Sequence, residues 1–132
     1  MAGAPGRLPL PAALVLDSSC WLEVFGGGAR AAWYEHAVAR PEPLIVPVIT
    51  VYEVVKYLSR VRSADAAQRA ALYMGSGTVV DIDQAIAVAA AGNGLPMADS
   101  LIYATAQAHG ATLWTQDAHF KGLAGVHYFD TA

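Results

Sequence analysis

Short apolar runs alternate with longer helical patterns along this chain. The runs at 12–16, 44–46, 78–80 and 112–115 are bounded by turn residues, which predicts short strands buried on both faces. A fifth run, at 126–129, predicts a last strand. Between them the pattern predicts helices at 20–25, 29–39, 48–62, 64–74, 84–91 and 98–109. Strands that alternate with helices predict an α/β fold with a mostly parallel sheet covered on both sides.

Polar and glycine residues mark the ends of several predicted helices. Ser18 and Ser19 are suited to cap the helix at 20–25, and Asp83 is suited to cap the alanine-rich helix that runs to about residue 91. Gly110 is expected to end the helix at 98–109, since glycine favours the position after a helix C-terminus. These signals set most helix boundaries from local sequence alone.

The length of the chain bounds its domain organisation. At 132 residues it is long enough for one core and too short for two ordinary ones. Residues 1–11 are rich in glycine, proline and alanine, which predicts a flexible N-terminal tail ahead of a single domain at 12–132. Hydrophobic residues make up 55% and charged residues 14% of the chain, so we expect a partner to cover part of its surface.

The charge of the chain is mildly acidic, with one basic region. The net charge of -3 is unlike the basic excess of most nucleic-acid-binding domains. Four basic residues nevertheless fall close together and form either a local basic edge or an ordinary solvated helix face: Lys56, Arg60, Arg62 and Arg69. No run reaches the roughly 18 to 20 apolar residues that span a membrane, so the expected location is cytoplasmic.

Four acidic residues stand where the predicted elements bring them together. Asp17 and Asp117 directly follow predicted strands, and the functional crevice of an open α/β sheet lies outside the carboxyl ends of its strands. Glu53 and Asp99 lie near the starts of helices and can face the same edge. Converging carboxylates repel one another unless a cation neutralises them. Oxygen ligands suit Mg²⁺ or Mn²⁺, and the single Cys20 excludes an internal disulfide and a zinc site built from cysteines.

Each of these residues also has a structural interpretation. Asp17 can cap a helix, Asp99 can stabilise a helix dipole, Asp117 can occupy a turn, and Glu53 can pair with Lys56 at the surface. Further candidates are weaker. His119 invites a role as general base, but a histidine in a loop is more often a surface residue, and the sequence favours the latter. The aromatic residues are core or partner contacts rather than base-stacking platforms, with the first two a guess for a partner surface: Trp33, Tyr34, Trp21, Tyr52 and Tyr57.

The four acids and their neighbours resemble the motifs of a known family. Leu16-Asp17-Ser-Ser, Val51-Tyr-Glu53-Val, Leu95-Pro-Met-Ala-Asp99-Ser-Leu-Ile and Thr115-Gln-Asp117-Ala-His-Phe are similar, in order and spacing, to the four acidic motifs of PIN-domain ribonucleases. The length is most similar to VapC-type toxins of toxin-antitoxin pairs. The resemblance implies a PIN-like three-layer α/β/α sandwich with a central, mostly parallel sheet of four or five strands.

The same resemblance implies a function and its residues. Asp17, Glu53, Asp99 and Asp117 would hold one or two Mg²⁺ or Mn²⁺ ions for hydrolysis of RNA phosphodiester bonds by metal-activated water. Thr115 matches a hydroxyl position that the family often has and would support the acids. From the residues themselves, Ser18 is a further supporting candidate, and Lys56, Arg60 and Arg62 of the basic region are candidates for RNA contacts. The implied partners are an RNA substrate, a small antitoxin that covers the active site, and a second copy in a homodimer, without a membrane.

Two other functions fit the sequence less well. One is a catalytically silent PIN-like module that binds RNA or protein. The other is a small phosphohydrolase with Asp17 as nucleophile, which would require a second acid two residues later. Position 19 is serine, so the sequence disfavours this alternative.

Overall fold

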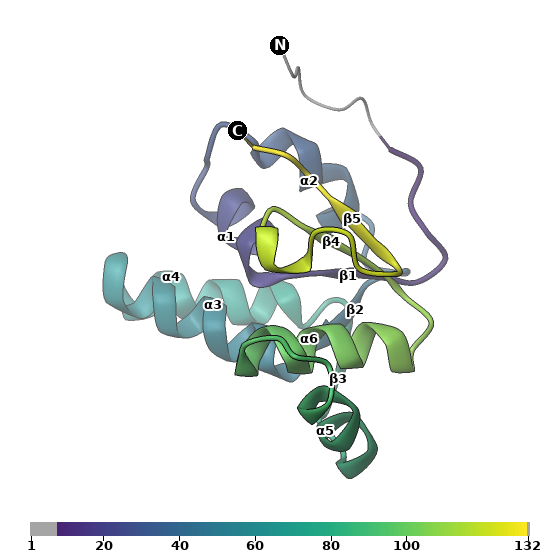
Figure 1. Cartoon of the computed structure of the whole chain (residues 1–132). Coiled ribbons are helices and arrows are strands. Elements are labelled where there is room, and N and C mark those ends of the chain that lie inside the picture. Colours follow the sequence, from purple (N-terminus) through teal and green to yellow (C-terminus); the bar gives the residue numbers. More distant parts are fainter. Residues whose placement is uncertain (1–7, 132) are drawn as a thin grey trace.

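The computed structural model describes residues 8–131 and places helices on both sides of a set of parallel strands (Figure 1). The strands are β1 (Leu14–Leu16), β2 (Ile45–Pro47), β3 (Thr78–Val80), β4 (Thr112–Thr115) and β5 (Val126–Tyr128). The helices are α1 (Ser18–Phe25), α2 (Ala31–Val38), α3 (Val48–Val61), α4 (Ala64–Met74), α5 (Gln84–Ala91) and α6 (Met97–Ala108), and η1 (Ala118–Phe120) is a 3₁₀ turn. The predicted α/β fold is confirmed.

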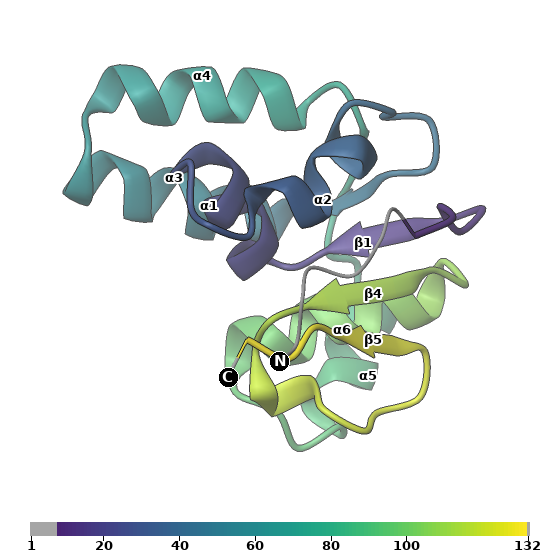
Figure 2. The same cartoon turned by 90° about the horizontal axis from the view of Figure 1, so that it is seen from above.

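All strand pairs are parallel, but hydrogen bonding divides the strands into two groups. β1, β4 and β5 form one sheet in the order β1-β4-β5, and β2 pairs with β3. Figure 2 shows β1, β4 and β5 side by side. One parallel bridge, between Leu14 and Leu44, links the groups, and the Leu14 N–H donates to the Pro43 carbonyl over 2.8 Å. The predicted five strands are present, but β1 and β2 run together too briefly for a continuous ladder.

Side chains that alternate along the strands divide the core between the two faces. Leu14 and Leu16 of β1 belong to a cluster with residues of the first four helices, whereas Val15 belongs to a second cluster with Ile102 of α6. All three β1 side chains are at most 1% exposed. This is the pattern predicted for a strand covered on both faces. In Figure 1, α1 and α2 lie on one side of the strands and α6 on the other.

Most predicted boundaries agree with the structure to within two residues, and one predicted cap is wrong. α1 begins at Ser18, and its cap is Asp17, whose carboxylate accepts the Cys20 N–H over 3.3 Å. Ser18 and Ser19 therefore lie inside the helix, and their hydroxyls bond to other partners. Asp83 caps α5 as predicted. Gly110 follows α6 with a φ of 61°, a conformation that glycine adopts without strain.

The N-terminal segment is described only in part. Residues 1–7 of the predicted tail, and residue 132, lie outside the described residues. Leu8 and Leu10 are half-buried and pack against the larger core cluster, and the Leu8 carbonyl lies 2.9 Å from Nε2 of His36. The domain boundary at residue 12 stays a prediction. Within residues 8–131, every helix is too short or too polar to cross a bilayer.

Candidate metal centre

The carboxyl ends of β1 and β4 place two of the four acids next to each other. β1 and β4 are adjacent and parallel, with Leu16 opposite Trp114. Asp17 directly follows β1, and its N–H donates to the Trp114 carbonyl over 3.1 Å. Asp117 follows β4 after one intervening residue and caps η1. The prediction that strand ends bring Asp17 and Asp117 to one edge of the sheet is confirmed.

The third acid, Asp99, comes from the first turn of α6. Apolar contacts of Ile102 and Ala106 with the second core cluster fix this helix against the sheet. The start of α6 is tied to the preceding loop because the Asn93 side-chain amide donates to the Ser100 carbonyl over 3.0 Å. The Asp99 carboxylate is consequently held in place by its helix, and its side chain is 17% exposed.

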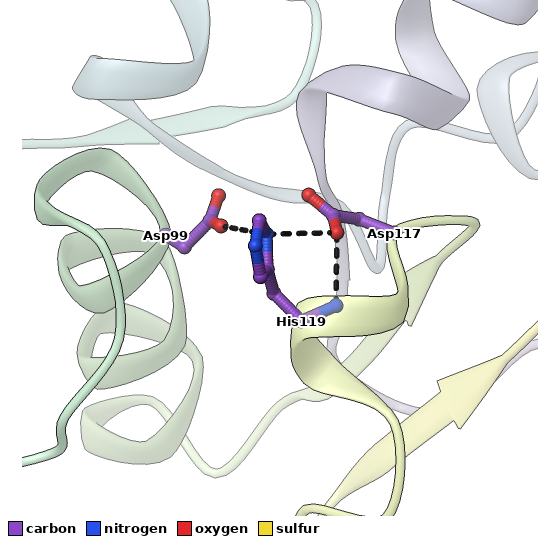
Figure 3. Close-up of side chains that lie close together, drawn as sticks. All are labelled: Asp99, Asp117 and His119. Carbon is purple, nitrogen blue, oxygen red and sulfur yellow. Dashed lines mark hydrogen bonds and ion pairs between the residues drawn. The ribbon is translucent and has the colours of Figure 1, made fainter.

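His119 lies between the carboxylates of Asp99 and Asp117 (Figure 3). Its Nδ1 is 3.2 Å from Oδ2 of Asp99 and 3.0 Å from Oδ1 of Asp117. The same Asp117 oxygen accepts the His119 N–H over 2.9 Å. The sequence favoured a surface histidine, and the side chain is indeed 60% exposed, but its ring faces the acids. The spacing Asp117-Ala-His119 was the missed signal, because a cap at Asp117 turns the chain and brings His119 back over it.

Asp17 is surrounded by donors and is buried, at 3% exposed. Ser19 Oγ donates to Oδ1 and Thr115 Oγ1 donates to Oδ2, each over 2.6 Å. Burial raises the pKa of Asp17 to about 6, these hydrogen bonds oppose the rise, and the negative charge of Asp117 adds to it. Both Asp17 oxygens thus have partners within the protein. Thr115 also accepts the Asp117 N–H over 2.8 Å, so one hydroxyl connects two of the predicted acids.

Glu53 on α3 is linked by a hydrogen bond to Ser18, the residue that follows Asp17. Its Oε1 accepts a 2.5 Å hydrogen bond from Oγ of Ser18, a residue predicted to support the acids. Burial, followed by the charge of Asp117, raises the pKa of Asp99, and the charge of Glu53 adds to this rise. Glu53 is therefore close enough to Asp99 for their charges to interact.

Within residues 8–131, one group of acidic and histidine side chains is close enough together that it could hold a metal ion. One ligand atom each from Asp99, Asp117 and His119 lies within 4.8 Å of the others. The donors are two carboxylates and one imidazole, a set that divalent cations accept. Burial and then the charge of Asp117 raise the pKa of Asp99, and a bound cation would oppose both effects. Asp17 and Glu53 border this trio without belonging to it.

A hydrogen-bond network behind the acids escaped the sequence analysis. The Gln116 side chain accepts from Tyr34 Oη over 2.9 Å and donates to Glu23 over 3.2 Å. Its backbone N–H donates to Ser19 Oγ over 3.2 Å, and Ser19 in turn donates to Asp17. Gln116 lies between Thr115 and Asp117, so the network fixes the backbone that carries both. Its long-range partners could not be found from local sequence.

The remaining candidate residues differ in exposure: two are buried, and the basic residues lie at the surface. Tyr34 is fully buried, so the guess that it belongs to a partner surface is wrong. Cys20 is buried and free, and burial raises the pKa of its thiol. Arg69 pairs with Asp65 on α4. The three basic residues predicted to contact RNA, in contrast, are all exposed: Lys56, Arg60 and Arg62.

Comparisons with known proteins agree on the fold. The structure is similar to a chain of a toxin-antitoxin complex from Klebsiella pneumoniae, with a TM-score of 0.72, 24% identity, and 87% of this chain and 96% of that chain covered. It is also similar to VapC20 of Mycobacterium tuberculosis, a toxin that cleaves the sarcin-ricin loop. The TM-score is 0.66 and the identity 16%, and the match covers 89% of this chain and 90% of that chain. A third similar structure is a VapBC2 complex from Rickettsia felis bound to promoter DNA, with a TM-score of 0.69, 15% identity, and 89% and 98% covered.

Because these solved structures are less than 25% identical to this chain, their similarity shows a shared fold. The family is shown by a match to a protein-family model. A search of curated protein sequences gives no significant match. The family model described as PIN domain matches residues 14–126, which is most of the chain and includes all four predicted acids. The chain belongs to the PIN domain family.

Proposed function

We propose that this PIN-domain protein is the toxin of a type II toxin-antitoxin pair and acts as a metal-dependent endoribonuclease. The observation that carries the proposal is the convergence of Asp99, Asp117 and His119 at the carboxyl edge of the sheet. The similarity to VapC20, a toxin that cleaves the sarcin-ricin loop, and to a Klebsiella toxin-antitoxin complex supports RNA as the substrate and an antitoxin as the partner.

The residues of the site have two kinds of proposed role: metal binding and the positioning of the metal-binding side chains. Asp99, Asp117 and His119 would hold a Mg²⁺ or Mn²⁺ ion directly, with Asp17 and Glu53 completing the negative field around it. Such an ion supplies Lewis-acid activation of water and stabilises the charge that develops on the phosphate oxygens. Thr115 positions Asp17 and Asp117 through its hydroxyl, and Ser18 positions Glu53.

His119 adds a nitrogen donor to a carboxylate site. Mg²⁺ strongly prefers oxygen ligands, whereas imidazole suits later transition metals, with Mn²⁺ between the two. If Nδ1 of His119 binds the ion, the site favours Mn²⁺ over Mg²⁺ more than carboxylates alone would. His119 is thus proposed as a determinant of metal preference.

Partner binding is the second part of the proposal. Large apolar side chains are exposed on helices away from the acids, including Leu72 at 76% and Val88 at 68%. Exposed apolar side chains of this size fit the partner-covered surface that the composition predicted. An antitoxin and a second copy of the chain are the proposed occupants, as the toxin-antitoxin complexes of similar structure suggest.

The experiment is a cleavage assay with the purified chain freed of any partner. We expect cleavage of RNA with Mn²⁺ or Mg²⁺, none with EDTA, and none in an Asp99→Asn/Asp117→Asn variant. Glu35→Gln, which removes an exposed charge on α2, is the matched control and should cleave normally. Absence of cleavage of a total-RNA pool, with metal binding verified, would contradict the proposal.

One observation favours the alternative of a silent binding module. Asp17 is 3% exposed and lies outside the group of side chains placed to hold an ion, so that group contains fewer of the predicted acids than expected from the sequence. A silent module would bind RNA without cutting it. The phosphohydrolase alternative is weaker still, since a 3% exposed carboxylate engaged at both oxygens is poorly placed to attack a phosphate.

A further inference from the structure

Two exposed tyrosines on α3 carry basic side chains across their rings. Tyr52 is 56% exposed and Tyr57 is 43% exposed. Lys56 Nζ lies 5.5 Å from the centre of the Tyr52 ring, and Arg60 Cζ lies 5.7 Å from the centre of the Tyr57 ring. Lys56 Nζ also donates to Tyr52 Oη over 3.3 Å. We call these four residues the Tyr–cation strip.

The strip begins at the candidate active site. Glu53 lies next to Tyr52 in sequence, and the four residues of the strip together with Glu53 line one pocket of about 390 Å³. The spacing of three and four residues keeps these side chains on one face of the helix. Arg60 is seven residues beyond Glu53, which corresponds to about 10 Å along the helix axis. The strip therefore leads from the acids outward along α3.

A second pocket continues from the strip towards α1. It measures about 410 Å³, and its lining includes Tyr57, Arg62 and Ser19. Arg62 closes part of its rim by donating to the Gly26 carbonyl over 3.3 Å. Tyr57 thus borders both pockets, and the positive charge of Arg62 extends the strip. The surface combines aromatic faces and cations next to a carboxylate site.

We infer that the Tyr–cation strip is a track for single-stranded RNA, an inference that rests on the proposed nuclease function. Bases stack on the rings of Tyr52 and Tyr57, and backbone phosphates pair with Lys56, Arg60 and Arg62. Aromatic platforms combined with a basic groove are the common means of holding single strands, and they tolerate sequence variation because every base has a π face. A duplex cannot use the rings, since its bases are stacked on one another.

Charge complementarity favours RNA over a protein as the occupant. A site of several carboxylates repels a phosphate backbone, so an RNA-cleaving site gains from cations beside it. Two of the four cation–ring contacts within residues 8–131 lie on this one helix face. The two most exposed aliphatic residues proposed above for protein partners, Leu72 and Val88, lie on α4 and α5, and on α3 the aliphatic Val61 is 47% exposed at the far end of the strip.

The test measures RNA binding separately from cleavage. The full-length chain in EDTA is titrated with a short single-stranded RNA that contains 2-aminopurine, whose fluorescence falls when the base stacks. Tyr52→Leu and Tyr57→Leu should each weaken binding by about 5- to 150-fold and reduce the quenching. Tyr52→Phe and Tyr57→Phe keep the ring and should stay within about twofold of wild type, which shows that the Leu effects come from stacking.

Two controls and one further measurement test whether RNA binding depends specifically on the Tyr–cation strip. The controls are a tyrosine outside the strip and an RNA duplex, and the further measurement is the salt dependence of binding. Tyr73→Leu changes a tyrosine on α4 that is 47% exposed and packs against Phe25, and it should leave RNA binding unchanged. Lys56→Gln and Arg60→Gln should each reduce the slope of log affinity against log salt by about 0.7 for every RNA phosphate that the side chain neutralises in the wild type. The same RNA annealed into a duplex should bind more weakly and without quenching.

Several results would overturn the inference. Equal RNA binding by the Tyr52→Leu/Tyr57→Leu variant would do so, as would equal binding of duplex and single strand. Unchanged RNA binding together with a fall in molar mass by light scattering would assign the strip to an interface between two copies. If RNA binding depends on the two rings but no metal-dependent cleavage occurs, the RNA track is supported and the proposed nuclease function is refuted. If RNA is cleaved equally well by the wild type and by both Leu variants, the nuclease function is supported and the RNA track is refuted.

Discussion

Two acidic regions of the candidate metal centre, Asp17 on one hand and Asp99 with Asp117 on the other, differ in solvent exposure and in hydrogen-bond partners. Asp17 is 3% exposed, and its two oxygens accept hydrogen bonds from Ser19, Thr115 and the Cys20 N–H. Asp99 and Asp117 have side chains that are 17% and 34% exposed, and they meet at His119. The first carboxyl group is buried among donors of its own protein, whereas the other two are more exposed and face a shared imidazole nitrogen. An acid at a strand end can therefore serve as an anchor or as a ligand.

The largest expected effect comes from neutralising either of the two acids proposed as metal ligands. Asp99→Asn or Asp117→Asn should lower RNA cleavage by more than the roughly 100-fold loss that residues behind a metal ligand produce. The free energy of unfolding of the metal-free protein should rise slightly or stay the same, because one of two neighbouring negative charges is removed. Cleavage rates and denaturant unfolding check both. A variant with wild-type cleavage would show that the altered acid is no ligand.

Removing the hydroxyl between the regions should have the next largest effect. Thr115→Val takes away the donor to Asp17 and the acceptor of the Asp117 N–H. We expect cleavage to fall by about 10- to 100-fold and the free energy of unfolding to fall by about 1–3 kcal/mol. Thr115→Ser keeps the hydroxyl and is the control. Equal losses in both variants would attribute the effect to packing rather than to the hydrogen bonds.

The buried carboxylate should reveal itself through pH. Burial raises the pKa of Asp17 from 3.8 to about 6, so folding favours its protonated form. Its contribution to stability is complete below about pH 4 and is lost as the pH rises through about 6, a change of about 3 kcal/mol. Urea unfolding in EDTA should show the wild type losing this much relative to Asp17→Asn between about pH 3 and pH 7. A pH-independent difference would mean that Asp17 is not buried in this way.

The smallest effect concerns metal preference at the exposed region. His119→Gln replaces a nitrogen donor with an amide, and we expect the ratio of Mn²⁺ to Mg²⁺ affinity to fall by about tenfold. Calorimetry measures the ratio, and pulsed EPR of bound Mn²⁺ should lose its nitrogen coupling. His109→Gln, at the exposed end of α6, serves as control. A ratio that does not change would leave His119 outside the coordination sphere.

The sequence predicted the elements well because their signals are local. The helix at 64–74 and the strands at 78–80 and 112–115 agree with the structure residue for residue, since turn residues or glycines bound each of them. The meeting of Asp17 and Asp117 was predictable from parallel topology alone. The helix cap at Asp17 was not, because three consecutive residues, Asp17, Ser18 and Ser19, all have capping side chains and only tertiary contacts decide among them.

The division of roles within the site lay beyond the sequence. Thr115 and Asp17 are 98 residues apart, and their hydrogen bond depends on side-chain geometry at adjacent strand ends. His119 was expected at the surface, and its ring orientation follows from the turn that Asp117 caps. Tyr52 and Tyr57 were expected in the core or at a partner surface, and the structure excludes the core because both are exposed, on the face of α3 that carries Glu53. Such facts depend on packing, which single-sequence patterns do not encode.

The most direct test of the central claim is a calorimetric titration of the metal-free chain with Mn²⁺. If Asp99 and Asp117 are the ligand pair, the wild type and Glu35→Gln should bind Mn²⁺ with the same affinity. The Asp99→Asn/Asp117→Asn variant should show no saturable binding while keeping its circular dichroism spectrum. Saturable Mn²⁺ binding of wild-type affinity in that variant would contradict the claim.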